Sequence, residues 1–295
     1  MLQKLFVRAS QEMHDRENMS AIVAEFDEVQ DQLESAFEKI AGSVGTYSVQ
    51  AGSSIQSQID AAVADGFGVG NPCLINIEPG TYTENLTLYA GIHLASMIRQ
   101  KSYATVVSGT IGFSAASAGA AAANMVLLTG ISVSADGSAP TFLFSGTHPQ
   151  IVRFYNGEIN AGGGGQPPLS MTNTGSGSTF IMDNSNLNVG AGAANAAAVA
   201  AGKLSIARGQ ANSNAAGNVA LLSTGGEFEV SNSAVVGGVT LAAGTSLFLY
   251  VLINSSLTPV FAGAGNLMAG SVSVAGGGSG IAGGITQIPL VEIDT

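Results

Sequence analysis

The fold is decided by the stretch Leu74-Ile75-Asn76-Ile77-Glu78-Pro79-Gly80-Thr81-Tyr82-Thr83-Glu84-Asn85-Leu86-Thr87-Leu88, followed by Gly91-Ile92-His93-Leu94-Ala95-Ser96. The apolar run Leu74–Ile77 stops at Pro79-Gly80, a dipeptide typical of turns because proline fixes φ and glycine accepts positive φ. Asn85–Leu88 and Gly91–Leu94 alternate polar and apolar residues, so each would bury one face. Short strands separated by short turns predict a coil in which each turn stacks on the next.

A capping helix is expected just before this stretch. Ser53 or Ser54 offers an N-cap for a helix that runs to about Ala64, and Asp65-Gly66 closes it. Its apolar side would comprise Ile55, Ile59, Ala62 and Val63. Such a helix would cover the first strands of the coil, whose edges are otherwise unpaired.

The helix and the Pro-Gly turn together carry a family resemblance. Ser54–Ala62, followed by Pro79-Gly80-Thr81-Tyr82-Thr83-Glu84-Asn85, resembles the opening of pectin-lyase-like right-handed parallel β-helix proteins, specifically over about residues 48–110. The resemblance implies a mainly β protein, a single-stranded right-handed parallel β-helix (solenoid) at residues 46–295, with its capping helix near residues 53–64. The superfamily includes pectin-degrading enzymes and many bacteriophage virion proteins.

Downstream, a loose repeat agrees with a solenoid. Four segments that begin at Asn156, Asn184, Asn232 and Asn254 share an Asn-[Gly/Ser]-x-aliphatic pattern, and Arg208 fills the gap imperfectly. The steps of 28, 24, 24 and 22 residues are typical of a β-solenoid. Asparagine tolerates left-handed geometry and stacks in ladders, so these residues are predicted to lie at bends. Small side chains are expected to fill the core.

Composition limits the classes of protein. Only 10% of the residues are charged, the formal net charge is −11, and no Lys/Arg cluster occurs, which argues against nucleic-acid binding. Cys73 is the single cysteine, so a small core residue and folding in a reducing cytoplasm are expected. The N-terminus lacks the apolar core of a signal peptide, and polar breaks in Ala115–Ala135 make a membrane span unexpected.

Residues 1–45 form a compositionally separate helical module. From Met19 the apolar residues follow a heptad over three repeats, with Glu and Asp on the outer faces. The predicted oligomerisation residues are Met19, Ile22, Phe26, Val29, Leu33, Ala36 and Ile40. Large residues at the first position and β-branched ones at the second favour three or more strands. The alternative is an amphipathic helix that folds back on its own β domain.

A second apolar set precedes the heptad and is out of register with it. Leu2, Leu5 and Phe6 begin this set, which is predicted to form a short separate helix that docks on another protein. The segment Ala41–Gly45 ends the helical module with the small and glycine residues of a helix C-terminus.

One pair of carboxylates is a candidate for catalysis. Glu158 and Asp183 lie one repeat apart and would approach each other if they shared a face, as paired carboxylates require in glycoside hydrolysis. His14, His93 and His148 are far apart and fall in different modules or turns of the coil. The Gly-rich tracts lack the strand–helix setting of a phosphate loop. No catalytic, metal or cofactor-binding residue is therefore assigned, and no cofactor is expected.

The sequence favours a non-enzymatic viral structural protein. The expected molecule is a homotrimeric β-helix, folded in the host cytoplasm and attached to the virion through its N-terminal helices, as a capsid decoration or cement protein. Its expected partners are its own copies and the major capsid protein or another virion protein. Two alternatives stay open: a tailspike or tail-fibre adhesin that binds host glycans, and a polysaccharide lyase or esterase of the pectin-degrading type.

Overall fold

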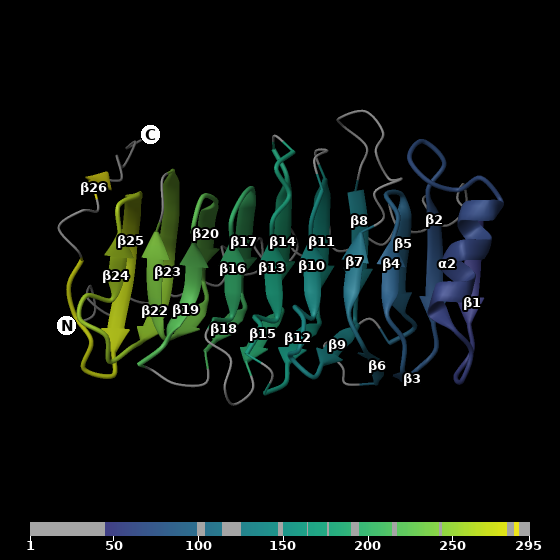
Figure 1. The fold of residues 1–295 in the computed structure, drawn as a ribbon, viewed down its shortest axis with the longest axis horizontal. Coiled ribbons are helices and arrows are strands. Elements are labelled where there is room, and N and C mark those ends of the chain that lie inside the picture. The colour runs from purple at the N-terminus through teal and green to yellow at the C-terminus, as the bar shows by residue number, and fades with distance from the viewer. Residues whose placement is uncertain are drawn as a thin grey trace, which may run out of the picture. The chain divides into compact units, whose positions relative to one another are not determined.

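The computed structural model describes residues 45–98, 104–113, 125–146, 150–163, 165–175, 177–189, 195–213, 217–241, 244–281 and 286–288. Gly45–Thr295 forms one compact unit, distinct from Met1–Val44. Within this unit every pairing between the described strands is parallel, and the strands wind through three ladders along one axis, from the α2 end to β25 (Figure 1). The expected parallel β-solenoid is therefore confirmed.

Ladder 1 holds the longest run of stacked strands. Its members are β1 (Gly45–Val49), β2 (Cys73–Ile77), β5 (Ile92–Ser96), β8 (Met125–Thr129), β11 (Ile151–Tyr155), β14 (Thr179–Asp183), β17 (Lys203–Ala207), β20 (Glu227–Ser231) and β26 (Thr286–Ile288). Two longer strands, β23 (Thr245–Asn254) and β25 (Asn266–Ala275), continue from ladder 1 into ladder 2.

Ladders 2 and 3 complete each turn. Ladder 2 comprises β3 (Gly80–Tyr82), β6 (Thr105–Ser108), β9 (Ser132–Ala135), β12 (Glu158–Ala161), β15 (Asn186–Val189), β18 (Gln210–Asn212) and β21 (Ala234–Val236). Ladder 3 is the 8-stranded sheet of β4 (Leu86–Leu88), β7 (Ile111–Phe113), β10 (Phe142–Phe144), β13 (Leu169–Met171), β16 (Ala197–Val199), β19 (Val219–Ser223), β22 (Gly238–Leu241) and β24 (Phe261–Gly263).

The stretch that opens the coil forms β2 to β5, one strand more than its sequence pattern predicts. The additional strand is β3, which begins at Gly80, the second residue of the Pro79-Gly80 dipeptide. Its Tyr82 side chain is buried, and the hydroxyl donates to the backbone oxygen of Glu78 at 2.7 Å. The turn therefore leads straight into ladder 2.

The capping helix is confirmed as α2 (Ile55–Ala64), with Ser54 as its N-cap. The Ser54 hydroxyl accepts from the Ser57 N–H at 3.1 Å. The Glu84 carboxylate accepts from the N–H groups of Ile55 at 2.7 Å and Gln56 at 3.1 Å. Helix N-termini leave such donors unpaired and favour negative charge, so Glu84 fixes α2 to the first turn of the coil.

Large side chains fill the core, contrary to the expectation of small ones. Six phenylalanines are fully buried: Phe142, Phe144, Phe154, Phe180, Phe228 and Phe248. The rings of Phe142 and Phe180 meet edge to face, with centroids 4.9 Å apart. Because each turn places only a few inward side chains, aromatic rings from different ladders are needed to fill the space between them.

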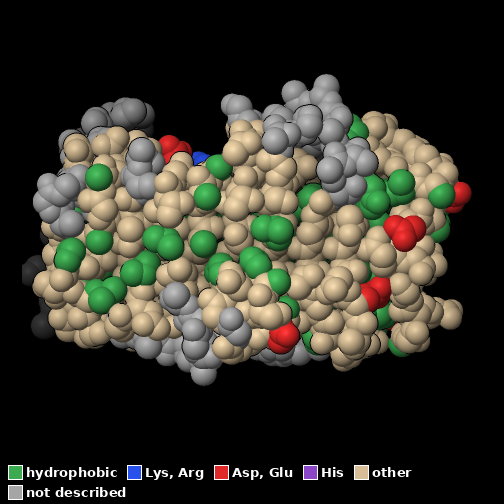
Figure 2. Space-filling model, in the orientation of Figure 1, with side chains coloured by type: hydrophobic (Ala, Val, Ile, Leu, Met, Phe, Trp, Pro, Cys, Tyr) green, Lys and Arg blue, Asp and Glu red, His purple; other side chains and the backbone are tan. Residues whose placement is uncertain are grey.

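The surface carries few charges. Figure 2 shows one face on which backbone and uncharged polar side chains dominate, with acidic side chains mostly toward the α2 end. Among the described residues, no helix is long and apolar enough to cross a membrane.

Candidate functional site

A column of left-handed residues marks the bend between ladders 1 and 2. Successive turns place there Gly130, Asn156, Asn184, Arg208, Asn232, Tyr250 and Ser271, each with a φ between 46° and 69°. The predicted bend positions of Asn156, Asn184 and Asn232 are confirmed, as is the substitute Arg208. The prediction that Asn254 lies at a bend is wrong, because Asn254 lies in ladder 2 opposite Val236.

After the four bends from Asn156 to Asn232, the next residue alternates between glycine and serine for a packing reason. A Cβ on Gly157 would lie 2.2 Å from the Ile131 oxygen, and one on Gly209 would lie 2.3 Å from the Ser185 oxygen. Glycine is therefore required where the preceding turn comes this close.

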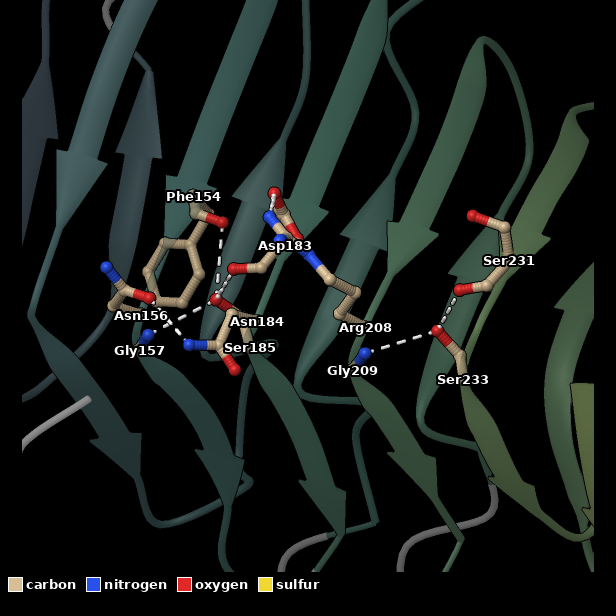
Figure 3. A network of polar contacts seen from close by, with 10 residues as sticks. All are labelled: Phe154, Asn156, Gly157, Asp183, Asn184, Ser185, Arg208, Gly209, Ser231 and Ser233. Carbon is tan, nitrogen blue, oxygen red and sulfur yellow. Dashed lines mark hydrogen bonds and ion pairs between the residues drawn. The ribbon is translucent and has the colours of Figure 1, made fainter. Parts of the chain in front are cut away.

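The serines bridge the same close approach with hydrogen bonds (Figure 3). The Ser185 hydroxyl accepts from the Gly157 N–H at 3.2 Å and donates to the Asp183 oxygen at 2.8 Å. One repeat on, the Ser233 hydroxyl accepts from the Gly209 N–H at 3.1 Å. The repeat pattern includes serine at this position but does not predict its bridging role.

Side chains on the outside of the bend also connect one turn to the next. The Asn184 amide donates to the Asn156 side-chain oxygen at 2.8 Å. Arg208 occupies the equivalent position on the next turn. Its Nε donates to the Asp183 carboxylate at 2.8 Å, and its Nη2 forms an ion pair with the same carboxylate (Figure 3). The hydrogen bond to Asp183 raises the pKa of Arg208.

Amide side chains continue outward across ladder 2, on a surface that we call the amide face. It comprises Asn156, Glu158 and Asn160 on one turn, Asn184, Asn186 and Asn188 on the next, and Arg208, Gln210 and Asn212 on the third. Asn186 donates to the Glu158 carboxylate at 3.2 Å, and Asn188 donates to Asn160 at 2.9 Å. All three columns are thus linked between their first two turns.

The candidate catalytic pair does not share a face. Asp183 ends β14 in ladder 1, where Arg208 engages its carboxylate. Glu158 begins β12 in ladder 2, is 6% exposed and accepts from Asn186. Asp183 precedes the bend of its turn, whereas Glu158 follows the bend of its own turn, so the two acids lie in different ladders. The expectation that they approach on one face is wrong.

The other singled-out residues are core elements. Cys73 is fully buried as predicted, and burial raises the pKa of its thiol to about 11. His93 is 8% exposed, its Nδ1 accepts from the Leu127 N–H at 3.1 Å, and burial lowers its pKa to about 4. The described residues include no group of three His, Cys, Asp or Glu side chains suited to a metal ion. His14 and His148 lie outside the described residues.

The residues predicted to act in assembly also lie outside the described residues. These are the heptad residues Met19, Ile22, Phe26, Val29, Leu33, Ala36 and Ile40 and the docking residues Leu2, Leu5 and Phe6. The coiled coil and the docking helix therefore stay predictions.

Comparison with known proteins leaves the fold as the firm result. No protein-family model, curated protein or solved structure matches the chain. The parallel β-solenoid is compatible with a pectin-lyase-like β-helix.

Proposed function

We propose that the protein is a structural component of a virus particle, a trimeric β-helix attached through its N-terminal helices as a capsid decoration protein. The observation that carries the proposal is how the solenoid uses its polar side chains. Asn184 bonds to Asn156, Arg208 to Asp183, and Ser233 to the Gly209 backbone, so they tie one turn to the next. Such contacts stiffen a rod that has to withstand load.

The trimer is tested in the full-length chain by changing one heptad residue. Phe26→Asp places a charge in the predicted seam, whereas Ala24→Asp places the same charge on the outer face of the same helix. Light scattering is expected to give three chains for the unchanged protein and for Ala24→Asp, and one chain for Phe26→Asp. A monomeric unchanged protein would refute the trimer.

Attachment is tested by co-sedimentation of the full-length chain with the shells of the virus that encodes it. Binding is expected for the unchanged protein, and loss is expected after Leu5→Asp in the predicted docking helix. Adhesion to whole host cells, without any affinity for shells, would favour a tail adhesin over a decoration protein.

An enzymatic alternative has its own readout. Incubation with bacterial polysaccharides is expected to leave their chain length unchanged. If the chains shorten, and if Glu158→Gln or Asp183→Asn abolishes the shortening, then the protein is a polysaccharide-degrading enzyme and the structural proposal fails.

A further inference from the structure

Asn156 and Gly157 form a dipeptide that occurs once in the chain, at the bend between β11 and β12. In a flexible chain, the main-chain nitrogen after an asparagine attacks the Cγ carbon of the asparagine side chain. The bond from Cγ to the side-chain nitrogen then breaks, and ammonia leaves with the proton of the attacking nitrogen. A succinimide ring remains, which water opens to aspartate or to isoaspartate. Glycine favours this reaction because it has no Cβ to hinder the approach.

The neighbouring bends of the coil avoid this combination of residues. Asn184 and Asn232 are each followed by serine, whose side chain hinders the attack. Gly209 follows Arg208 instead of an asparagine. Among the described left-handed bends, the two reacting groups therefore meet only at Asn156-Gly157.

The fold restrains the attacking nitrogen. The Gly157 N–H donates to the Ser185 hydroxyl at 3.2 Å, and both residues are buried (Figure 3). Attack requires this nitrogen to lose its proton and to turn toward the asparagine side chain, so the hydrogen bond has to break first. The main chain is also anchored on either side, because the Asn156 N–H donates to the Asp183 oxygen at 3.2 Å. The Gly157 oxygen accepts from the Asn186 N–H at 3.1 Å.

The asparagine side chain is restrained too, but its contact does not by itself prevent the reaction. The Asn156 side-chain oxygen accepts from the Asn184 amide at 2.8 Å. A donor on this oxygen polarises the carbonyl group and makes Cγ more electrophilic, as in an oxyanion hole. Protection of the dipeptide therefore depends on the Gly157 N–H, and on Ser185 as the positioning residue that holds this N–H.

The isoaspartate product would not fit the bend. Isoaspartate carries the main chain through its side-chain carbon, which adds one methylene group between β11 and β12. The register of both strands is fixed by the turns before and after them. A Cβ on Gly157 would already lie 2.2 Å from the Ile131 oxygen, so the bend has no room for the longer chain. Once formed, isoaspartate therefore keeps this turn from closing again.

We propose that Asn156-Gly157 is a deamidation site that the folded coil keeps unreacted, and that it reacts only when this bend opens. Local opening releases the Gly157 nitrogen, and the added methylene group then makes the opening permanent. The side-chain amide of Asn156 thus records whether this turn has opened during the lifetime of the protein. The site goes beyond virion attachment and does not depend on it, because it involves only this bend and the turns that contact it.

The test measures loss of the Asn156 amide in the full-length protein at mildly alkaline pH, by peptide mapping with mass spectrometry. The folded protein is compared with the same chain unfolded in guanidinium chloride. Loss is expected to be at least tenfold slower in the folded protein, with isoaspartate among the products of the unfolded chain. Equal rates in the two states would overturn the proposal, as would faster amide loss at Asn184 or Asn232 in the folded protein.

Ser185→Ala tests the protecting contact without changing the reacting dipeptide. This variant is expected to accelerate loss of the Asn156 amide in the folded protein at least threefold. Ser205→Ala, on the outer side of β17, is the matched control, and its rate is expected to stay within twofold of the unchanged protein. Circular dichroism shows whether Ser185→Ala is folded; if it is not, the folded and unfolded states of the unchanged protein still decide the proposal.

Hydrogen exchange separates local opening of this bend from opening of the whole coil. The Gly209 N–H donates to the Ser233 hydroxyl at 3.1 Å, as the Gly157 N–H donates to Ser185. In Ser185→Ala the Gly157 amide is expected to exchange faster, whereas exchange of the Gly209 amide is expected to stay unchanged. Equal acceleration at both glycines would overturn the protecting role of Ser185, and so would faster exchange at Gly157 without faster deamidation.

Discussion

Tyr250 occupies in its turn the bend position that Asn232 occupies in the turn before, with φ values of 52° and 47°. The Asn232 N–H donates to the Leu249 oxygen at 3.0 Å, and Ser231 pairs with Leu249, which fixes this equivalence. Asparagine reaches this left-handed region at low cost, whereas an aromatic residue does not. Tyr250 therefore holds backbone strain at a position where the same fold elsewhere uses asparagine.

Tyr250→Asn is expected to raise the free energy of unfolding by about 1 kcal/mol, because it relieves left-handed strain. Tyr250 is 66% exposed, so little buried area is lost. Urea unfolding measures the change as a higher midpoint with an unchanged slope.

The control for this prediction is Leu252→Asn on the same strand. Leu252 is 51% exposed, and its φ is not positive. This variant removes a similarly exposed apolar side chain without relieving strain, so its stability is expected to stay the same or fall. An equal gain in both variants would mean that surface polarity, not backbone geometry, is responsible.

The bend that the repeat pattern predicts at Asn254 lies instead at Tyr250. Asn254-Ser255 copies the Asn-Ser pattern of the true bends, yet Asn254 pairs with Val236 within ladder 2. The Phe228 N–H reaches Ser246, only 18 residues later, whereas the three turns before it are 28, 24 and 24 residues long. A pattern identifies residues that tolerate left-handed geometry, but the length of each turn is set by three-dimensional stacking.

The same limit applies to the candidate site. The strands near Leu74, the helix capped by Ser54 and the ladder asparagines follow from local pattern alone, and all three are confirmed. Whether Glu158 and Asp183 meet depends on which side of a bend each acid falls, and Glu84 caps α2 across 29 residues of chain. A contact that is made once, such as that of Glu84 with α2, leaves no periodic signal in the sequence.

Ser185→Ala is expected to lower the free energy of unfolding by about 2 kcal/mol, because it leaves the buried Gly157 N–H without its serine acceptor. Ser205→Ala, on the outer side of β17, is the matched control and is expected to change stability by less than about 0.5 kcal/mol. Hydrogen exchange of the Gly157 amide should accelerate in Ser185→Ala alone. Equal costs for both variants would contradict the bridging role of Ser185.

Gly209→Ala is expected to destabilise the fold by about 3 kcal/mol, because the added Cβ would lie 2.3 Å from the Ser185 oxygen and neither backbone yields easily. Gly112→Ala on β7 supplies the comparison, since a Cβ there would have nothing within 4 Å. Gly112→Ala is expected to be neutral or to stabilise by about 0.5 kcal/mol. Thermal unfolding separates the two variants, and similar melting temperatures would show that the close approach at Gly209 is not limiting.

His93 is expected to make stability depend on pH. Its pKa is about 4 in the folded protein and about 6.5 in the unfolded chain, so between these values the unfolded state binds more protons. Stability should therefore be constant above about pH 7, fall as the pH is lowered toward 4, and then level off, with a total loss of at most about 3 kcal/mol from this residue.

His93→Asn isolates this contribution. The asparagine side-chain oxygen can accept from the Leu127 N–H, as His93 Nδ1 does, so the fold is kept. Because asparagine does not titrate, the variant lacks the proton-binding site. The carboxylates and the other histidines are common to both proteins and cancel in the difference. Urea unfolding at several pH values should show the two proteins diverging between pH 7 and 4, with the variant less sensitive to acid. Parallel curves over this range would mean that the pKa of His93 is the same in the folded coil as in the unfolded chain.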